Sequence, residues 1–127
     1  MPKKVVQSQK FPKPVGPYSV VTEAGGFVFV SGQVALDRAT GQVSGKSVAE
    51  QTRTILENIK LILEECGASL KDVVKANVYL ADISTFNEMN EVYKQYFPEN
   101  PPARTTVQAT LAKKEYLVEI DVIAYKG

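Results

Sequence analysis

Two acidic residues and one arginine have the types and surroundings that best suit chemistry. Glu119 and Asp121 interrupt an otherwise apolar stretch, and a strand would place both on one face, about 7 Å apart. Such a pair resembles the paired carboxylates of glycosidases, but it fits equally well two side chains that face solvent or bind lysines. Arg104 follows the stiff Pro101–Pro102 pair, which favours two-point capture of a carboxylate by its guanidinium. Alternatively, Arg104 ends a strand with its head in water.

Further candidates lie beside rigid or apolar segments. Tyr18 follows Gly16–Pro17, so its ring is either a phenol donor, the wall of a pocket or part of the core. Ser31 and Gly32 end an apolar run, where they either expose a hydroxyl and amides to a ligand or form a plain turn. No G-x-S-x-G motif surrounds Ser31, which excludes a serine hydrolase. Asn90 interrupts an apolar helical stripe, and a hydrogen bond to neighbouring backbone would explain it.

The composition excludes several kinds of site. The chain has no histidine, so it has no Ser-His-Asp triad, Cys-His dyad, histidine-ligated metal or two-histidine ribonuclease chemistry. The single Cys66 excludes a cysteine-cluster zinc site, and we interpret it as a small core residue. No metal site is therefore predicted. Lys and Arg number 15 against 14 Asp and Glu, and this net charge of +1 argues against a nucleic-acid partner on electrostatic grounds.

The length of 127 residues fits a single domain spanning residues 1–127. No stretch is apolar for long enough to span a bilayer, so no membrane partner is predicted. The segment Met1–Lys10 carries lysines but lacks the apolar region of a secretory signal. The expectation is a cytoplasmic protein.

Local patterns predict the secondary structure. Gly25–Gly26 joins two apolar, β-branched runs as a hairpin. Ser47 and Glu50 form a capping box at the start of a helix that Gly67 ends. Asp82 or Ser84 caps a second helix, whose apolar stripe contains Phe86, Met89, Tyr93 and Phe97. Strands are expected near Val5–Val6 and over residues 19–24, 27–31, 71–81, 105–111 and 116–125.

The resulting order, β-ββ-α-β-α-ββ, predicts an α+β fold in which two helices pack on one face of the sheet. The run Phe27–Val30 is apolar at consecutive positions, so both of its faces should be covered. The chain has no spare element for the second face. We therefore expect another copy of the chain to cover it, with ligand sites between subunits.

Six short motifs occur in the order seen in the YjgF/RidA family of reactive-intermediate (enamine/imine) deaminases, which the chain resembles from about Val6 to Ala124. They are Gly16-Pro17-Tyr18-Ser19, Val30-Ser31-Gly32-Gln33, Asn77-Val78-Tyr79-Leu80, Phe86-Asn87-Glu88-Met89-Asn90 with Tyr93 and Phe97, Pro102-Ala103-Arg104-Thr105-Thr106-Val107, and Val118-Glu119-Ile120-Asp121. Each motif alone is modest, and the series is specific.

The resemblance implies a chorismate-mutase-like α+β fold and a homotrimer with three clefts between subunits. It also implies a hydrolase acting on C=N bonds, which converts 2-imino acids such as 2-iminopropanoate and 2-iminobutanoate into 2-oxo acids and ammonia without a cofactor. In this comparison Arg104 would hold the substrate carboxylate, and Glu119 would activate water or relay protons. An imine is already electrophilic, so such chemistry suits a site without histidine.

The resemblance also assigns the pocket wall. Tyr18, Ser31 and the backbone of Gly32 would line it, and Asn90 would add a polar side. Thr106 stands where many deaminases of the family carry cysteine, and its hydroxyl and amide remain suited to anion binding.

Two other classes of function stay open. One is a non-catalytic module that binds small carboxylates or regulates a partner enzyme. The other is a ribonuclease or translation inhibitor, a description also given to members of the family. The near-neutral charge and the lack of histidine argue against the second class.

Overall fold

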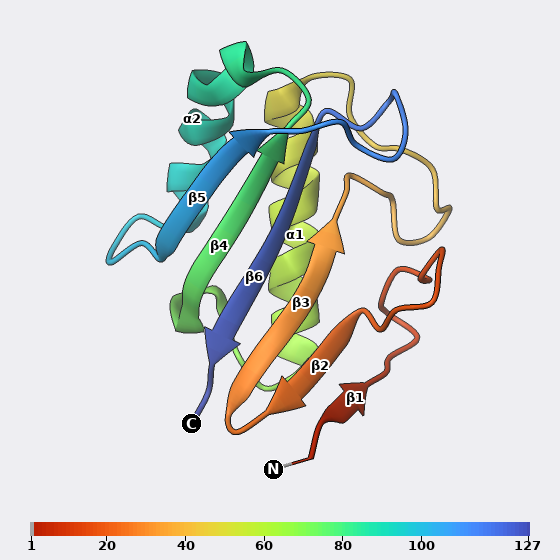
Figure 1. Ribbon diagram of the computed structural model, residues 1–127, viewed down its shortest axis with the longest axis vertical. Helices are drawn as coiled ribbons and strands as arrows, with labels where there is room; N and C mark the ends of the chain where they lie inside the picture. Colours follow the sequence, from red (N-terminus) through yellow and green to blue (C-terminus); the bar gives the residue numbers. More distant parts are fainter. Residues whose placement is uncertain (1) are drawn as a thin grey trace.

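The computed structural model describes residues 2–127 and has an α+β fold (Figure 1). One mixed sheet has the strand order β1-β2-β3-β6-β4-β5, and both long helices lie on the same face of it. Of the strand pairs in the described residues, only β4 and β5 are parallel. The predicted element order and helix placement are confirmed. The elements are β1 (Lys4–Val6), β2 (Val21–Ala24), β3 (Phe27–Gln33), α1 (Val48–Glu65), β4 (Val73–Leu80), α2 (Phe86–Tyr96), β5 (Ala103–Gln108) and β6 (Val118–Tyr125), with short 3₁₀ turns at Leu70–Asp72 and Ile83–Thr85.

Local chemistry explains the hairpin and the start of α1. Gly25 and Gly26 have φ values of 57° and 86°, the positive pair that a tight two-residue hairpin requires. The Ser47 hydroxyl accepts a 3.1 Å hydrogen bond from the Glu50 amide, as a capping box predicts. The Glu50 carboxylate instead accepts from the Lys46 amide at 2.9 Å, one residue earlier than expected.

The residue predicted to cap the second helix caps a different element. The Asp82 carboxylate accepts from the Ser84 amide at 2.9 Å, but this bond caps the 3₁₀ turn Ile83–Thr85. The α2 helix begins only at Phe86, and Thr85 precedes it without a side-chain cap. An Asx bond of this kind stabilises a tight turn as readily as a helix start, so the sequence alone does not distinguish the two.

A β-bulge interrupts the alternation of buried and exposed side chains at the start of β4. The register shifts between Val73, which pairs with Ala124, and Lys75, which pairs with Ile123. Val73 is therefore buried and Val74 is 47% exposed, so the regular alternation of the later residues of β4 does not extend to its start. The segment before Val73 forms the turn Leu70–Asp72 rather than strand.

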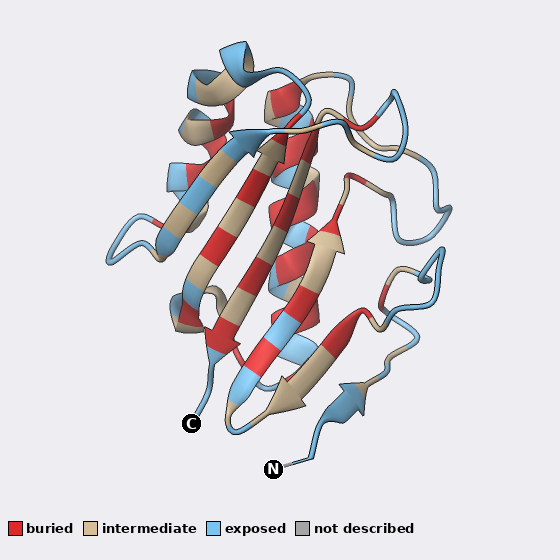
Figure 2. Cartoon of the chain, in the orientation of Figure 1, coloured by how far each residue is buried: buried red, intermediate tan, exposed pale blue. Residues whose placement is uncertain are grey.

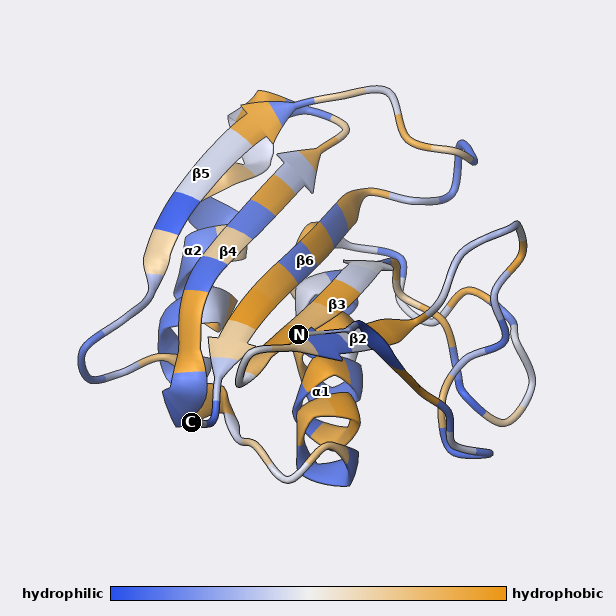
Figure 3. Cartoon of the chain, turned by 60° about the horizontal axis from the view of Figure 1, so that its bottom comes forward, coloured by the Kyte–Doolittle hydropathy of each residue, from blue (hydrophilic) through white to orange (hydrophobic). Residues whose placement is uncertain are grey.

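The core lies between the sheet and the helices. Buried and partly buried residues alternate along β4 and β6 (Figure 2), and apolar and polar residues alternate with them (Figure 3). The inward residues meet fully buried side chains of α1 such as Ile55 and Ile59. No described helix is both long and apolar enough to cross a membrane.

The opposite face of the sheet is open within one copy. Phe27 and Phe29 are each 39% exposed, and Tyr125 is 47% exposed. The ring centroids of Phe27 and Tyr125 lie 4.8 Å apart, so these side chains form an aromatic patch on the open face. The expected cover on both faces of Phe27–Val30 is therefore absent within residues 2–127.

Candidate functional site

The strand register places Arg104 and Glu119 on opposite faces of the sheet. Arg104 pairs with Ala76, whose side chain is buried on the helix face. Glu119 pairs with Tyr79, which points to the open face. Because paired residues share a face and neighbours along a strand alternate, the two charges are separated by the sheet. The structure divides the predicted residues into an arginine half-site (Asn90, Arg104, Thr106) and a glutamate half-site (Tyr18, Ser31, Gly32, Glu119).

The arginine half-site holds its cation firmly without an acidic partner. Nη1 of Arg104 donates a 2.7 Å hydrogen bond to Oδ1 of Asn90. The guanidinium carbon lies 4.7 Å from the ring centroid of Tyr93 and 5.4 Å from that of Phe86. None of the ion pairs within residues 2–127 includes Arg104. The water-facing alternative for Arg104 and the backbone-bonded alternative for Asn90 are therefore both wrong.

A second unpaired polar group belongs to the same face of β5. Thr106 lies two residues beyond Arg104, and its hydroxyl is buried with no hydrogen-bond partner among the described residues. A buried hydroxyl without a partner costs free energy unless a ligand or water compensates it. The Thr106 hydroxyl is thus an unsatisfied polar group on the face of β5 that carries Arg104.

The glutamate half-site opens into a cavity of about 480 Å³. Tyr18, Ser31, Gly32 and Glu119 all line this cavity, so the structure brings these four predicted residues together. The hydrogen bonds and ion pairs within residues 2–127 leave the Glu119 carboxylate free. Burial, and then repulsion from the Asp121 carboxylate, raises the pKa of Glu119. This raised pKa suits a group that exchanges protons.

Gly32 leaves the space that Glu119 occupies. The register of β3 against β6 shifts between Val30 and Gln33, so Ser31 and Gly32 together oppose one residue of β6. A β-carbon added at Gly32 would overlap Oε2 of Glu119 and lie 3.0 Å from its carboxyl carbon. The bulge and the glycine therefore bring backbone directly against the carboxylate, as bulges beside functional sites often do.

The hydroxyl groups of Tyr18 and Ser31 each form one hydrogen bond within the chain and can form more. Tyr18 is 47% exposed, and its hydroxyl accepts a long 3.4 Å hydrogen bond from the Val15 amide. Core packing is therefore the wrong interpretation of Tyr18. The Ser31 hydroxyl donates to the Ser19 carbonyl at 2.6 Å, which leaves its lone pairs for a ligand. Ser31 lies in a strand bulge, so the plain-turn alternative is also wrong.

Asp121 shares the face of Glu119, as predicted, but it has different surroundings. Its oxygens accept a 2.9 Å bond from the Asn77 amide group and a 3.1 Å bond from the Tyr79 hydroxyl. Neither Glu119 nor Asp121 forms an ion pair with a lysine within residues 2–127. The lysine-paired interpretation is wrong, and Asp121 is committed to neighbours while Glu119 is not.

Sequence reasoning missed two aromatic contributors. The sequence places Tyr93 on the apolar stripe of α2 and in a family motif without a role in the site, yet its ring faces Arg104. Tyr116 was assigned to a strand, yet it lines the cavity beside Glu119. Tyr93 follows Asn90 by one helical turn, and this spacing was the available indication of a contact with the same arginine.

Cys66 is buried, as predicted, and burial raises the pKa of its thiol.

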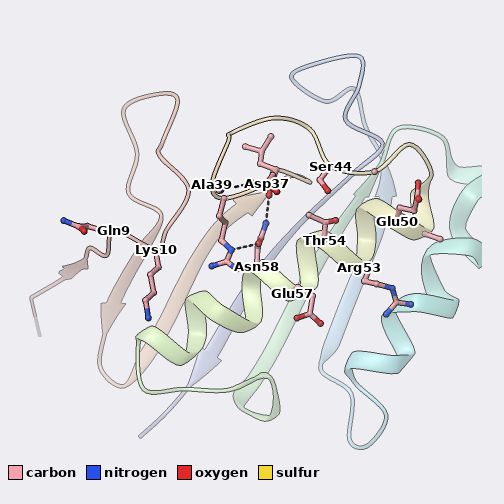
Figure 4. A pocket seen from close by; sticks show the side chains of 14 residues that line it. Gln9, Lys10, Asp37, Ala39, Ser44, Glu50, Arg53, Thr54, Glu57 and Asn58 are labelled. Carbon is pink, nitrogen blue, oxygen red and sulfur yellow. Dashed lines mark hydrogen bonds between the residues drawn. The ribbon is translucent and has the colours of Figure 1, made fainter.

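A larger hollow of about 850 Å³ follows the outer side of α1 (Figure 4) and contains none of the predicted site residues. Asn58 links its walls, because it accepts from Nε of Arg38 at 3.0 Å and donates to the Leu36 carbonyl at 2.8 Å. Arg53 donates to Gln95 on α2. The Asn58 contacts bind the loop after β3 to α1, and the Arg53 contact joins α1 to α2, so these side chains have a structural role. Within residues 2–127, no group of three or more acidic or cysteine side chains is arranged to hold a metal.

Comparison with known proteins decides the family. A family model described as Endoribonuclease L-PSP matches residues 8–126. The chain belongs to the YjgF/RidA family. A RutC family protein of Pyrococcus abyssi is 50% identical and covers 99% of both chains. The 2-iminobutanoate/2-iminopropanoate deaminase of Homo sapiens is 38% identical over 98% of this chain and 91% of the human one. Among solved structures, E. coli TdcF with bound serine matches with a TM-score of 0.89 and 35% identity, over 98% of this chain and 99% of TdcF.

These matches confirm the resemblance drawn from the six motifs, and the likeness to TdcF confirms the α+β fold with two helices on a mixed sheet. The YjgF/RidA relatives carry more than one name. The human relative is named for imine deamination, whereas the more similar Pyrococcus protein has only a family name.

Proposed function

We propose that this protein is a 2-iminoalkanoate deaminase, which hydrolyses reactive 2-imino acids to 2-oxo acids and ammonia. The observation that carries the proposal is a pair of complementary unpaired charges, Arg104 and Glu119, each surrounded by groups that leave it available. A 2-imino acid needs a cation for its carboxylate and a base for the water that attacks its imine carbon. The arginine half-site supplies the cation, and the glutamate half-site supplies the base.

Arg104 would bind the substrate carboxylate in the plane of its guanidinium group. Asn90 and the Met89 sulfur both accept from Nη1, and the aromatic rings lie against the face of the guanidinium. Within residues 2–127, the N–H groups of Nε and Nη2 therefore stay free for two-point binding. The unpaired hydroxyl of Thr106, on the same face of β5, would add a further hydrogen bond. Such binding fixes the orientation of the imine carbon, which lowers the entropic cost of the reaction.

Glu119 would move the protons. Water adds its oxygen to the imine carbon, the C=N electron pair moves to nitrogen, and Glu119 takes a proton from the water. Glu119 returns this proton to the nitrogen, which gives the neutral carbinolamine. The hydroxyl proton of the carbinolamine then passes through Glu119 to the amino nitrogen, and ammonia leaves as the C=O bond forms and the C–N bond breaks. Tyr18, Ser31 and the Gly32 backbone would line the cavity around these steps. The balanced reaction consumes only water, so it needs no cofactor.

The separation of the half-sites requires two copies of the chain in each active site. We propose a homotrimer, in which the open sheet face is covered and the arginine half-site of one copy meets the glutamate half-site of the next. The exposed aromatic patch of Phe27, Phe29 and Tyr125 supports this association, because soluble proteins rarely leave such a patch uncovered.

Similarity to named relatives adds support. The human relative, 38% identical, is named 2-iminobutanoate/2-iminopropanoate deaminase. The solved structure of E. coli TdcF holds serine, a small molecule with the same carboxylate group that Arg104 would bind. These names belong to the relatives, and they support the proposal by similarity.

The direct test generates the unstable substrate in place. A pyridoxal-phosphate dehydratase releases 2-aminoacrylate or 2-aminocrotonate from serine or threonine, and release of the 2-oxo acid is followed with and without this protein. We expect the wild-type protein to accelerate release and Arg104→Ala to abolish the acceleration. An unchanged rate on addition of wild-type protein would refute the deaminase assignment.

Two alternatives have distinct outcomes. Binding of a 2-oxo acid without any turnover would favour a non-catalytic carboxylate-binding or regulatory module. The description of the family model as an endoribonuclease motivates the second alternative. Cleavage of RNA that is lost in Glu119→Gln would favour it, although the net charge of +1 gives little attraction for a polyanion.

A further inference from the structure

The surroundings of Arg104 raise a question that the proposed deaminase activity does not answer. The side chain is half-buried, yet its partners within residues 2–127 are a neutral amide, the thioether sulfur of Met89 and aromatic rings. A carboxylate neighbour would stabilise the cation more strongly, but it would also compete with the carboxylate of a ligand. Aromatic faces stabilise a cation without occupying its N–H groups.

Tyr93 makes the closer of the two ring contacts. Its centroid lies 4.7 Å from the guanidinium carbon, whereas the Phe86 centroid lies at 5.4 Å. Tyr93 is 6% exposed, and it packs against Phe97 at a centroid distance of 4.7 Å, so its ring is fixed. A fixed ring restricts the tilt of the guanidinium plane, while Asn90 restricts its rotation within that plane.

The hydroxyl of Tyr93 does not account for this placement. It is buried and has no hydrogen-bond partner among the described residues. A buried phenol normally finds a partner, and one without a partner opposes folding. The face of the ring is therefore the part of Tyr93 that contacts a functional group.

We propose that Tyr93 is a positioning residue, whose ring face holds the Arg104 guanidinium so that its unused N–H edge meets the substrate carboxylate. This inference rests on the proposed function for its ligand and adds a residue that acts only through Arg104. Loss of the ring face would let the guanidinium tilt, which weakens carboxylate binding and leaves the proton transfers at Glu119 unchanged.

The experiment measures binding separately from turnover. The dissociation constant of 2-oxobutanoate, an unreactive carboxylate with the product's shape, is determined by calorimetry for wild-type protein, Tyr93→Phe and Tyr93→Leu. We expect Tyr93→Leu to raise both this constant and KM about tenfold, with kcat changed less than about twofold. Tyr93→Phe keeps the ring face and should bind within about twofold of wild type.

A matched control lies on the same helix. Tyr96 also lies beneath an arginine, Arg53, with the guanidinium carbon 6.0 Å from its ring centroid. Tyr96→Leu removes the same groups away from both half-sites, and its hydroxyl bond to Glu57 is lost as well. It should lower stability yet leave 2-oxobutanoate binding unchanged.

Fluorinated phenylalanines at position 93 keep the experiment decisive if Tyr93→Leu fails to fold. Fluorine withdraws electron density from the ring face with little change of shape, so binding should weaken steadily from phenylalanine to its monofluoro and trifluoro forms. Equal affinity across this series, or wild-type affinity in a folded Tyr93→Leu, would overturn the role of Tyr93. Binding of 2-oxobutanoate without imine hydrolysis would overturn the deaminase function alone. Wild-type protein that fails to bind 2-oxobutanoate would overturn both.

Discussion

The two half-sites hold their charges in contrasting ways. The Arg104 guanidinium is fixed on an edge by Asn90 and on its face by aromatic rings. Among residues 2–127 the Glu119 carboxylate has no such partner, and it lies over Gly32 at the wall of a cavity. Orientation of an anion requires a rigid cation, whereas proton exchange requires an acid whose oxygens are not already committed. Asp121, bound by Asn77 and Tyr79 on the same strand, shows what a committed carboxylate looks like here.

The largest expected effect is the recovery of imine hydrolysis when two inactive variants are mixed, so that one copy supplies Arg104 and another supplies Glu119. Arg104→Ala and Glu119→Gln should each be inactive alone, because every site lacks one charge. When equal amounts are unfolded together and refolded, about a quarter of the sites in random oligomers should carry both intact residues. Imine hydrolysis should then recover to about a quarter of the wild-type value.

Two outcomes would contradict this picture. Mixtures that stay inactive although the chains have mixed would show that both residues act within one copy. A wild-type protein that sediments as a single copy while fully active would do the same.

Replacement of Glu119 tests whether the uncommitted acid is the proton carrier. Glu119→Gln should lower kcat by about 10²–10⁴-fold, the usual contribution of a general acid–base group. The same change should stabilise the fold at neutral pH. Since the folded state raises the pKa of Glu119, the unfolded chain loses this proton more readily, and ionisation disfavours folding.

Urea denaturation at two pH values checks whether Glu119→Gln raises or lowers the free energy of unfolding. The gain in unfolding free energy for Glu119→Gln should be present at neutral pH and fade below the ordinary glutamate pKa, where both states keep the proton. Asp121→Asn is the matched control, because it disturbs hydrogen bonds from Asn77 and Tyr79 and should destabilise at neutral pH. Destabilisation of equal size by both variants would contradict the contrast between the two acids.

A methyl group at Gly32 should displace the acid without changing its chemistry. The added β-carbon overlaps Oε2 of Glu119, so Gly32→Ala should lower kcat about 10- to 100-fold by misplacing the carboxylate. Gly16→Ala is the control, because its β-carbon would meet only the Tyr18 ring at an ordinary 3.6 Å. Steady-state kinetics of the two variants should differ sharply, and equal rates would show that the carboxylate tolerates displacement.

The smallest expected effect concerns pH. If ionised Glu119 is the base, kcat/KM should fall on the acid side with a midpoint above the ordinary glutamate pKa, because burial and Asp121 raise the pKa of Glu119. Asp121→Asn removes the second cause, so it should move that midpoint toward lower pH. A midpoint that does not move would assign the acid limb to another group.

Features fixed by neighbouring residues were predictable from the sequence. The hairpin at Gly25–Gly26 and the Ser47 cap depend on adjacent residues, and both were predicted correctly. The alternation of β6 also placed Glu119 and Asp121 together on one face. The motifs led to the correct family, since they span the whole chain.

The division of the site was not predictable in the same way. Arg104 and Glu119 belong to β5 and β6, which are separated in the sheet by β4, so their relative faces depend on two registers. Bulges at Ser31–Gly32 and at Val74 change the alternation locally, and nothing in the local pattern fixes their positions. The contact of Tyr93 with Arg104 depends on how α2 packs over the edge of the sheet.

In the proposed mechanism, the sheet that separates the two charges also makes activity depend on protein concentration. An isolated copy carries both Arg104 and Glu119, yet it could not bring them to the same substrate molecule, because its own sheet lies between them. Progressive dilution should therefore extinguish turnover while each subunit stays folded. The amount of protein in the cell, rather than any added effector, would then determine whether the chemistry proceeds.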